Sequence, residues 1–184
     1  RATLRDGREV ALKVQRPGIE AVIREDLALL AGLAERVDRM TDLGRRLHFA
    51  DWVGEFRRAL LAELDYRVEA QNLDRFDTHF AKYPEVFVPK PVWDLTRPRL
   101  LTMELVQGTK ATDISGLCRT EQDLGGLAAA LVRAYLDQVL VHGEIHADPH
   151  PGNLLVTGDG RLALFDLGMV AHVPPRQRDR LLKL

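Results

Sequence analysis

Three polar side chains at fixed spacing stand near the C-terminal end of the sequence. Asp148 follows His146 in the string His-Ala-Asp-Pro-His-Pro-Gly-Asn, which ends at Asn153, and Asp166 opens an Asp-Leu-Gly string thirteen positions later. The order His-x-Asp-x4-Asn followed by Asp-x-Gly is typical of phosphoryl-transfer enzymes. The spacing therefore predicts a catalytic loop followed by a metal-binding turn.

The chemistry explains these residue types. A phosphoryl group in transfer carries spread negative charge, which the protein positions and neutralises with the help of magnesium. Magnesium prefers oxygen ligands, and Asn153 and Asp166 supply a carbonyl and a carboxylate. Asp148 would accept or orient a proton, His146 would brace the loop backbone, and the prolines beside them would restrict the loop.

Two other interpretations of this string have to be weighed. Asp, His, Pro and Gly are common in any surface turn, so the string could be an ordinary loop. His146, Asp148 and His150 could instead form a metal-ligand cluster of the zinc type. Three polar roles at these spacings, followed by a strand and a second aspartate, favour phosphotransfer over both.

A lysine near the N-terminus fits the same chemistry. Asp6-Gly7 is a strong hairpin signal, and the following strand, residues 9–15, carries Lys13 in the string Val-Ala-Leu-Lys. In kinases the Val-Ala-Ile-Lys lysine holds the nucleotide phosphates and pairs with a helix-borne glutamate. Glu63 and Glu69 are candidates, and because they lie six positions apart on different helix faces, only one can be the partner.

Apolar periodicity predicts the remaining elements. We expect a helix over 19–40, a connection over 44–50 and a second helix that Asp51 caps and that runs to about residue 76. Residues 86–92 form an edge or extended segment and 99–105 a strand. A helix over 124–140 follows a capping box of Thr120 and Asp123 and ends at Gly143. Strands 154–156 and 161–164 form a hairpin that brings Asn153 and Asp166 together. The basic tail begins another helix after Pro175.

Composition sets the broad class. Apolar residues make up 46% and charged residues 29% of 184 residues, as in an ordinary globular domain, and the net charge of −1 gives no reason to expect nucleic acid as a partner. Cys118 is the single cysteine, which fits a reducing compartment and a packing role. We expect no membrane-spanning run and no signal peptide. The chain opens without Met, so we interpret it as a fragment cut at both ends.

Together these strings resemble the UbiB (AarF) group of atypical kinases. The resemblance covers essentially the whole chain and is carried by Val10 to Gly18, Glu63-x-Asp65, Glu69-Ala70-x-Asn72, His146 to Asn153, and Asp166-Leu167-Gly168. It implies an α+β, protein-kinase-like, two-lobe fold. Residues 1–105 would be a small β-rich N-lobe with inserted helices. Residues 106–184 would supply the hinge, the catalytic loop and the metal-binding segment that start a helical C-lobe.

The resemblance also implies cofactors and site residues. ATP and Mg²⁺ would bind with Lys13 as nucleotide lysine, Glu69 as its partner, Asp148 and His146 in the catalytic loop, and Asn153 and Asp166 as metal ligands. Met103, Glu104 and Val106 would lie at the adenine pocket. Glu63 and Asp65 would belong to the family's own motif. Leu167 replaces the usual Phe of Asp-Phe-Gly, which spares the metal ligand, whereas a phosphate-covering loop would have to precede Arg1.

What such a protein would act on is a further expectation. The group is linked to ubiquinone and other isoprenoid lipids, so lipids or lipid-biosynthesis proteins are the expected partners. We expect a cytoplasmic site, peripheral to the inner membrane. The rival interpretations are a small-molecule phosphotransferase of the aminoglycoside or choline kinase type and a non-catalytic, nucleotide-gated lipid chaperone. The intact set of Lys13, Asp148, Asn153 and Asp166 argues against complete loss of chemistry.

Overall fold

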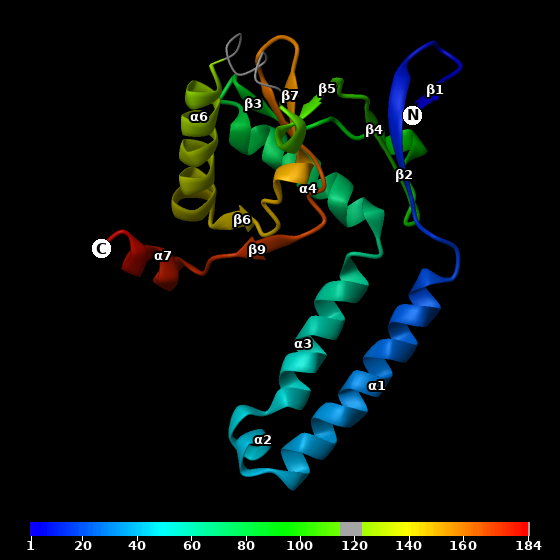
Figure 1. Cartoon of the computed structure of the whole chain (residues 1–184), viewed down its shortest axis with the longest axis vertical. Helices are drawn as coiled ribbons and strands as arrows, with labels where there is room; N and C mark the ends of the chain where they lie inside the picture. The colour runs from blue at the N-terminus through cyan, green and yellow to red at the C-terminus, as the bar shows by residue number, and fades with distance from the viewer. Residues whose placement is uncertain (115–122, 184) are drawn as a thin grey trace.

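Three small sheets form the β part of the residues that the structure describes (Figure 1). The computed structural model describes residues 1–114 and 123–183. The first sheet is antiparallel, with order β1-β2-β4, and joins β1 (Ala2–Thr3), β2 (Glu9–Val14) and β4 (Leu100–Glu104). The second has order β3-β8-β7-β5 and joins β3 (Val86–Phe87), β8 (Leu162–Leu164), β7 (Leu154–Thr157) and β5 (Gly108–Lys110). The third pairs β6 (Glu144–His146) with β9 (Val170–His172).

The helices fall into two groups. The first comprises α1 (Ile19–Met40), α2 (Asp42–Leu47) and α3 (Phe49–Ala62). The second comprises α4 (Tyr66–Phe80), α6 (Leu124–Asp137), which continues as a π-helical turn over Gln138–His142, and α7 (Pro175–Leu181). Short 3₁₀ turns occupy Trp93–Leu95, Ala111–Asp113 and Pro151–Asn153. The result is a mixed α+β fold, as the sequence predicts.

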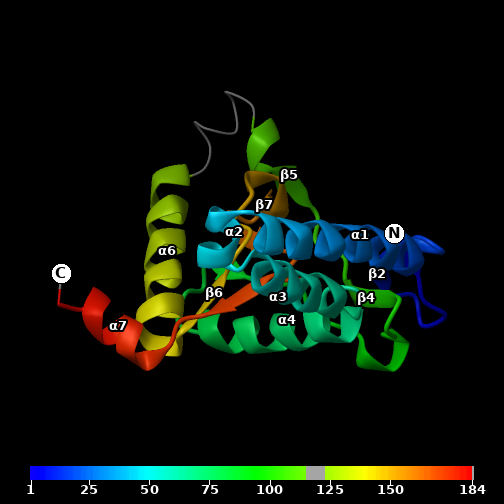
Figure 2. The same ribbon diagram turned by 90° about the horizontal axis from the view of Figure 1, so that it is seen from below.

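The helices α1, α2 and α3 form an arm that projects from the rest of the molecule. Figure 1 shows the arm below the sheets, and Figure 2 shows α1 and α3 running side by side. In α1 only Leu27 and Ala34 are buried, and α3 has no buried residue among those described. We call residues 19–62 the arm from here on.

Three expectations about this region are wrong. The predicted connection over 44–50 overlaps α2 and the start of α3, and the cap of α3 is His48 rather than Asp51, which lies in the first turn. The single helix predicted over 51–76 is two helices, because the chain turns extended at Asp65. The Asp65 side chain accepts from the backbone N–H of Arg67 at 3.0 Å and so starts α4 afresh.

The hydrophobic core lies around α4. This helix buries Ala70, Leu73, Phe76 and Phe80 against strands of the first two sheets and against α6, which contributes Leu127, Ala130 and Ala134. Leu101 of β4 and Leu164 of β8 are fully buried in the same cluster. Because α4 packs on β4 of the first sheet and on β3 of the second, this helix links the two sheets.

Several predicted elements are confirmed. The β7–β8 hairpin pairs Leu154 with Leu164, and Gly143 ends the helical stretch in the left-handed conformation with φ of 69°. Asp123 caps α6 by accepting from the N–H of Gly126 at 2.8 Å. Thr120, the other half of the predicted capping box, lies outside the described residues, as does Cys118 with its predicted packing role.

One expectation about membranes needs correction. Within the part of the chain that the structure describes, Leu124–His142 is long and apolar enough to cross a bilayer by length and composition, with a mean hydropathy of 1.4. The expectation considered unbroken apolar runs, whereas the average tolerates Arg133 and Asp137. A core helix of a folded domain passes the same test, and this stretch places three residues in the core.

Candidate active site

A lysine held between two carboxylates forms the centre of the candidate site. The Nζ of Lys13 donates to both carboxylate oxygens of Glu69, at 3.0 and 2.9 Å, and to the Oδ1 of Asp166 at 2.6 Å. These three residues come from β2, α4 and the turn after β8, far apart in the sequence. The structure therefore brings the predicted lysine, its helix partner and the predicted metal ligand together.

The fold explains how Lys13 reaches this position. In the antiparallel register Lys13 faces Leu101 of β4, which is fully buried beneath α4. The other face of the strand carries Val10, which is buried at the start of the strand, and Leu12 and Val14, which are 40% and 66% exposed, so around Lys13 the apolar side chains are the ones that face solvent. The ammonium also lies 5.4 Å from the ring centre of Tyr66, within range of a cation–π contact.

The question of which glutamate pairs with Lys13 is settled by the break between α3 and α4. Glu69 lies in α4 and is 3% exposed, whereas Glu63 is the C-cap residue of α3. The two glutamates therefore occupy separate helices. Glu69 makes the contact.

Electrostatics favour a cation here. Burial alone would lower the pKa of Lys13, but the carboxylates of Glu69 and Asp166 outweigh burial and raise it, so the amine stays charged. Burial, with Asp166 and Glu63 nearby, raises the pKa of Glu69 against the opposing effect of Lys13. Burial also raises the pKa of Glu63, with Asp166 and Asp148 adding to it. Two carboxylates thus contact one ammonium, and Glu63 lies within electrostatic range of Lys13 and Asp166.

Asp166 is held by the backbone around it. Its φ is 64°, in the left-handed region that few non-glycine residues adopt. Leu167, next in the chain, is fully buried, and the N–H of Phe165, just before Asp166, donates to the carbonyl of Asn153 at 3.1 Å. The hairpin therefore brings Asn153 and Asp166 to neighbouring ends of its two strands, as predicted.

Asp148 of the predicted catalytic loop lies on the solvent-exposed side of the candidate site. Asp148 is exposed, and its Oδ2 accepts a long hydrogen bond of 3.5 Å from the amide of Asn153. Asp148 also acts electrostatically on Glu63 and on His146. The aspartate is therefore near the site and open to a substrate.

The donor set fits magnesium and does not fit zinc. Magnesium is commonly bound by one or two carboxylates together with substrate phosphates, and Asp166 with Asn153 offers a hard oxygen pair of that kind. Among residues 1–114 and 123–183, no group of three or more His, Cys, Asp or Glu side chains could hold a metal ion. In this structure His146, Asp148 and His150 therefore do not form the zinc-type cluster weighed for them.

The two histidines of the string have separate structural roles. His146 is 2% exposed, and its Nδ1 lies 3.4 Å from the carbonyl oxygen of Met169, in the segment after the Asp-Leu-Gly turn. Burial lowers the pKa of His146, so the ring is neutral at physiological pH. His150 is exposed, and its Nδ1 accepts from the N–H of Gly152 at 2.9 Å.

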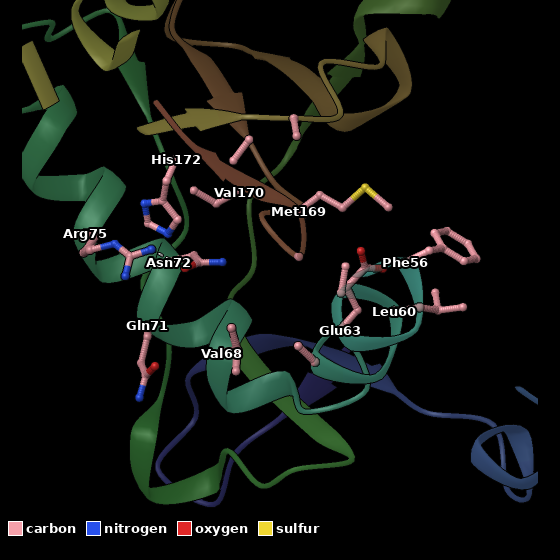
Figure 3. Close-up of a pocket in the computed structure, with 15 residues that line it drawn as sticks. Phe56, Leu60, Glu63, Val68, Gln71, Asn72, Arg75, Met169, Val170 and His172 are labelled. Atoms are coloured by element: carbon pink, nitrogen blue, oxygen red, sulfur yellow. Dashed lines mark hydrogen bonds between the residues drawn. The ribbon is translucent and has the colours of Figure 1, made fainter. Parts of the chain in front are cut away.

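A cavity of about 440 Å³ adjoins the site (Figure 3). Its lining comes from α3, from α4 and from the segment around β9, with Glu63 at the end of α3. Apolar side chains dominate the α3 wall, namely Phe56, Ala59 and Leu60. Asp65 is absent from this lining, because its carboxylate caps α4 and is paired with Arg67.

None of the three residues predicted for the adenine pocket lines the cavity beside the site. Met103 pairs with Ala11 across the first sheet and packs against the core. Glu104 and Val106 line a second cavity of about 520 Å³. Its lining also includes residues of the β7–β8 turn, such as Asp159, and does not include Lys13 or Asp166. The adenine role of these three residues stays a prediction.

Sequence reasoning assigned no role to two residues that the structure places at the site. Tyr66 follows Asp65 and lies beside Lys13, and Asn72 donates to the backbone of Leu167 at 2.7 Å. Asn72 stands in the Glu69-Ala70-x-Asn72 string, and its spacing of three from Glu69 puts both on one side of a helix. That spacing was a signal that Asn72 faces the site.

The fold and the site together define a protein of the kinase-like class. A family profile described as the ABC1 atypical kinase-like domain matches residues 1–184. The chain therefore belongs to the ABC1 atypical kinase-like family, as its resemblance to the UbiB group predicts.

Named relatives agree with this. A probable protein kinase UbiB of Azotobacter vinelandii is 38% identical over 98% of this chain and 34% of its own length. The chloroplastic protein Activity of bc1 complex kinase 8 of Arabidopsis thaliana is 41% identical over 96% of this chain and 24% of its own. The solved structure of the Rv3197–erythromycin complex from Mycobacterium tuberculosis has a TM-score of 0.77 and 32% identity, over 94% of this chain and 43% of that one. The chain thus spans less than half the length of these relatives.

Proposed function

We propose that this chain forms the ATP- and Mg²⁺-binding core of an atypical kinase or ATPase of the UbiB type. The observation that carries the proposal is the contact of Lys13 with both Glu69 and Asp166. In kinases the lysine–glutamate pair and the Asp-x-Gly aspartate must both be in place for phosphoryl transfer.

Each residue has a proposed role in this chemistry. Lys13 would bind phosphate oxygens, and Glu69 would hold its amine in position. Magnesium, when bound, would neutralise phosphate charge, and Asp166 and Asn153 are the residues that would hold it. Exposed Asp148 would orient the acceptor hydroxyl or water and accept its proton. Burial keeps the His146 ring neutral, so it supports the segment after Asp166 without adding positive charge.

The test is ATP turnover by the intact protein with and without Mg²⁺. Asp166→Asn should lower the magnesium-dependent rate by about 100-fold or more, since a metal ligand supplies several kcal/mol to the transition state. The matched control is Asp26→Asn, the same change at an exposed position of α1. Unchanged turnover in Asp166→Asn would show that this ligand is misassigned.

For the substrate we propose isoprenoid or quinone lipids, or proteins that make them, in a cytoplasmic location peripheral to the inner membrane. The support is the family and the apolar surface of the arm, where Leu29 and Trp52 are 70% and 73% exposed. Prenylated phenols should change the ATPase rate, and the protein should float with phospholipid vesicles. Faster phosphorylation of an aminoglycoside or choline would instead favour the small-molecule phosphotransferase.

A second candidate function is nucleotide-gated binding of a bulky apolar ligand without phosphorylation. The cavity of about 440 Å³ beside Glu63 favours it, and the solved relative Rv3197 is described as a complex with erythromycin. Titration of erythromycin into the protein, with and without ATP, separates the two functions. Binding that depends on ATP but leaves the ligand chemically unchanged would support the chaperone-like function.

A further inference from the structure

Asn72 connects the helix of the ion pair with the turn of the metal ligand. It lies on α4 three residues after Glu69, is 4% exposed, and its Nδ2 donates to the carbonyl oxygen of Leu167 at 2.7 Å. One face of α4 thus makes two contacts with the site: Glu69 holds Lys13, and Asn72 holds the peptide that follows Asp166.

The peptide that Asn72 holds needs a restraint. Asp166 has a φ of 64°, and a non-glycine residue in this region costs about 1 kcal/mol or more unless its surroundings fix it. The Leu167 carbonyl belongs to the peptide group between Leu167 and Gly168. A hydrogen bond to that oxygen sets the orientation of the turn, and with it the direction of the Asp166 carboxylate.

A second set of contacts fixes which way the amide of Asn72 points. Its Oδ1 accepts from the Nη2 of Arg75 at 2.6 Å, so its NH₂ group is directed at Leu167. The Nε of Arg75 lies 3.1 Å from Glu144 in β6, and Glu144 lies 3.3 Å from the ring of His172 in β9. Figure 3 shows Asn72, Arg75 and His172, and Glu144 joins the last two. Since β9 follows the turn directly, this series of contacts leads back to the same segment.

We propose that Asn72 is a positioning residue for Asp166, and through it for the magnesium ion and the phosphates, an inference that rests on the proposed function. Asn72 itself touches the turn rather than the reacting groups. Outer contacts of this kind orient metal ligands, and losing one typically lowers metal affinity by about 10- to 100-fold.

The test uses Asn72→Asp, which keeps the size of the side chain and an acceptor for Arg75 but replaces the donor facing Leu167. The matched control is Gln71→Glu, the same chemical change at the neighbouring, exposed position of the same cavity wall. Both variants are made in the intact protein, and thermal melting establishes that they fold.

The first readout needs no nucleotide. With isotope labels on the leucine carbonyl carbon and the glycine nitrogen, only Leu–Gly peptides give NMR signals, and this chain holds three, at 43–44, 124–125 and 167–168. The Leu167–Gly168 signal should move in Asn72→Asp and stay in place in Gln71→Glu, while the other two stay in place in both. An unmoved 167–168 signal in folded Asn72→Asp overturns the proposal.

The second readout is Mg²⁺ titration of the protein saturated with ADP. Asn72→Asp should weaken magnesium binding about tenfold, and ATP turnover should recover to near the wild-type rate when Mg²⁺ is raised to saturation. A purely structural role would lower the melting temperature without changing the magnesium requirement, which would also overturn the proposal. If the wild-type protein binds no Mg²⁺ with ADP, the proposed function fails, whereas the 167–168 signal still decides whether Asn72 holds the turn.

Discussion

The helices α1 and α4 show how differently two amphipathic helices can be used in one chain. The 22 residues of α1 bury two side chains, whereas the 15 residues of α4 bury six, including Glu69 and Asn72. The difference lies in what surrounds each helix: α1 packs on other helices of the arm, and α4 packs on two sheets and α6. Stability and chemistry are therefore concentrated at α4.

The largest difference between α4 and the arm should appear when one aromatic side chain in each is truncated to alanine. Phe76→Ala on α4 removes a side chain that is fully buried, and should cost about 3–5 kcal/mol of unfolding free energy. Phe56→Ala on α3, where the ring is 53% exposed, should cost less than about 1 kcal/mol. Urea denaturation measures both, and similar losses would mean that the arm is as tightly built as the core.

A second experiment isolates the arm. Leu27 is 1% exposed and is the largest buried side chain of α1, so Leu27→Ala should cost the arm about 2–3 kcal/mol of local stability. Hydrogen exchange should speed up across 19–62 and stay unchanged in α4. The control is Leu29→Ala at a position that is 70% exposed. Faster exchange in α4 as well would show that the two regions unfold as one unit.

The smallest expected effect lies at the junction of the two regions. Burial first, then Asp166 and Asp148, raise the pKa of Glu63 in the folded protein, with Lys13 opposing them. Ionised Glu63 therefore costs stability above its folded pKa, and this cost disappears as the pH falls below the unfolded value of 4.5.

Glu63→Gln should consequently stabilise the protein at pH 7, by about 0.5 kcal/mol or less because solvent screens the charge. The difference from wild type should vanish near pH 4, as measured by urea denaturation at the two pH values. A gain that grows toward acid pH would have the wrong sign and would contradict the assigned cause.

The sequence predicted those parts of the fold that depend on local pattern. Periodicity located α1 from Ile19 to Met40, and turn chemistry located the β7–β8 hairpin. Periodicity did not reveal that Leu30 and Leu33 would face outward, since burial depends on neighbours that a single helix does not specify. The parallel pairing of β3 with β8 and the pairing of β5 with β7 also join distant segments, which local pattern cannot show.

At the candidate site, too, local pattern predicted some features, and others depended on contacts between distant segments. Residue types and spacing were enough to select Lys13 and Asp166, because kinase chemistry constrains them strongly, whereas spacing left Glu63 and Glu69 open and the family resemblance favoured Glu69. The break at Asp65 escaped prediction because apolar periodicity runs through it, and a single capping side chain decides it. Asn72 was visible as part of a string, but its contact with Leu167 depends on how α4 meets the turn.

The left-handed backbone of Asp166 has a consequence for how a cation would be captured. Folding has already placed this residue in a conformation that an isolated chain would seldom visit. An arriving ion would meet a carboxylate that is aimed beforehand, so little binding energy would be lost to ordering it. The entropic penalty of assembling the site would then fall on the folding of the core rather than on each round of nucleotide binding.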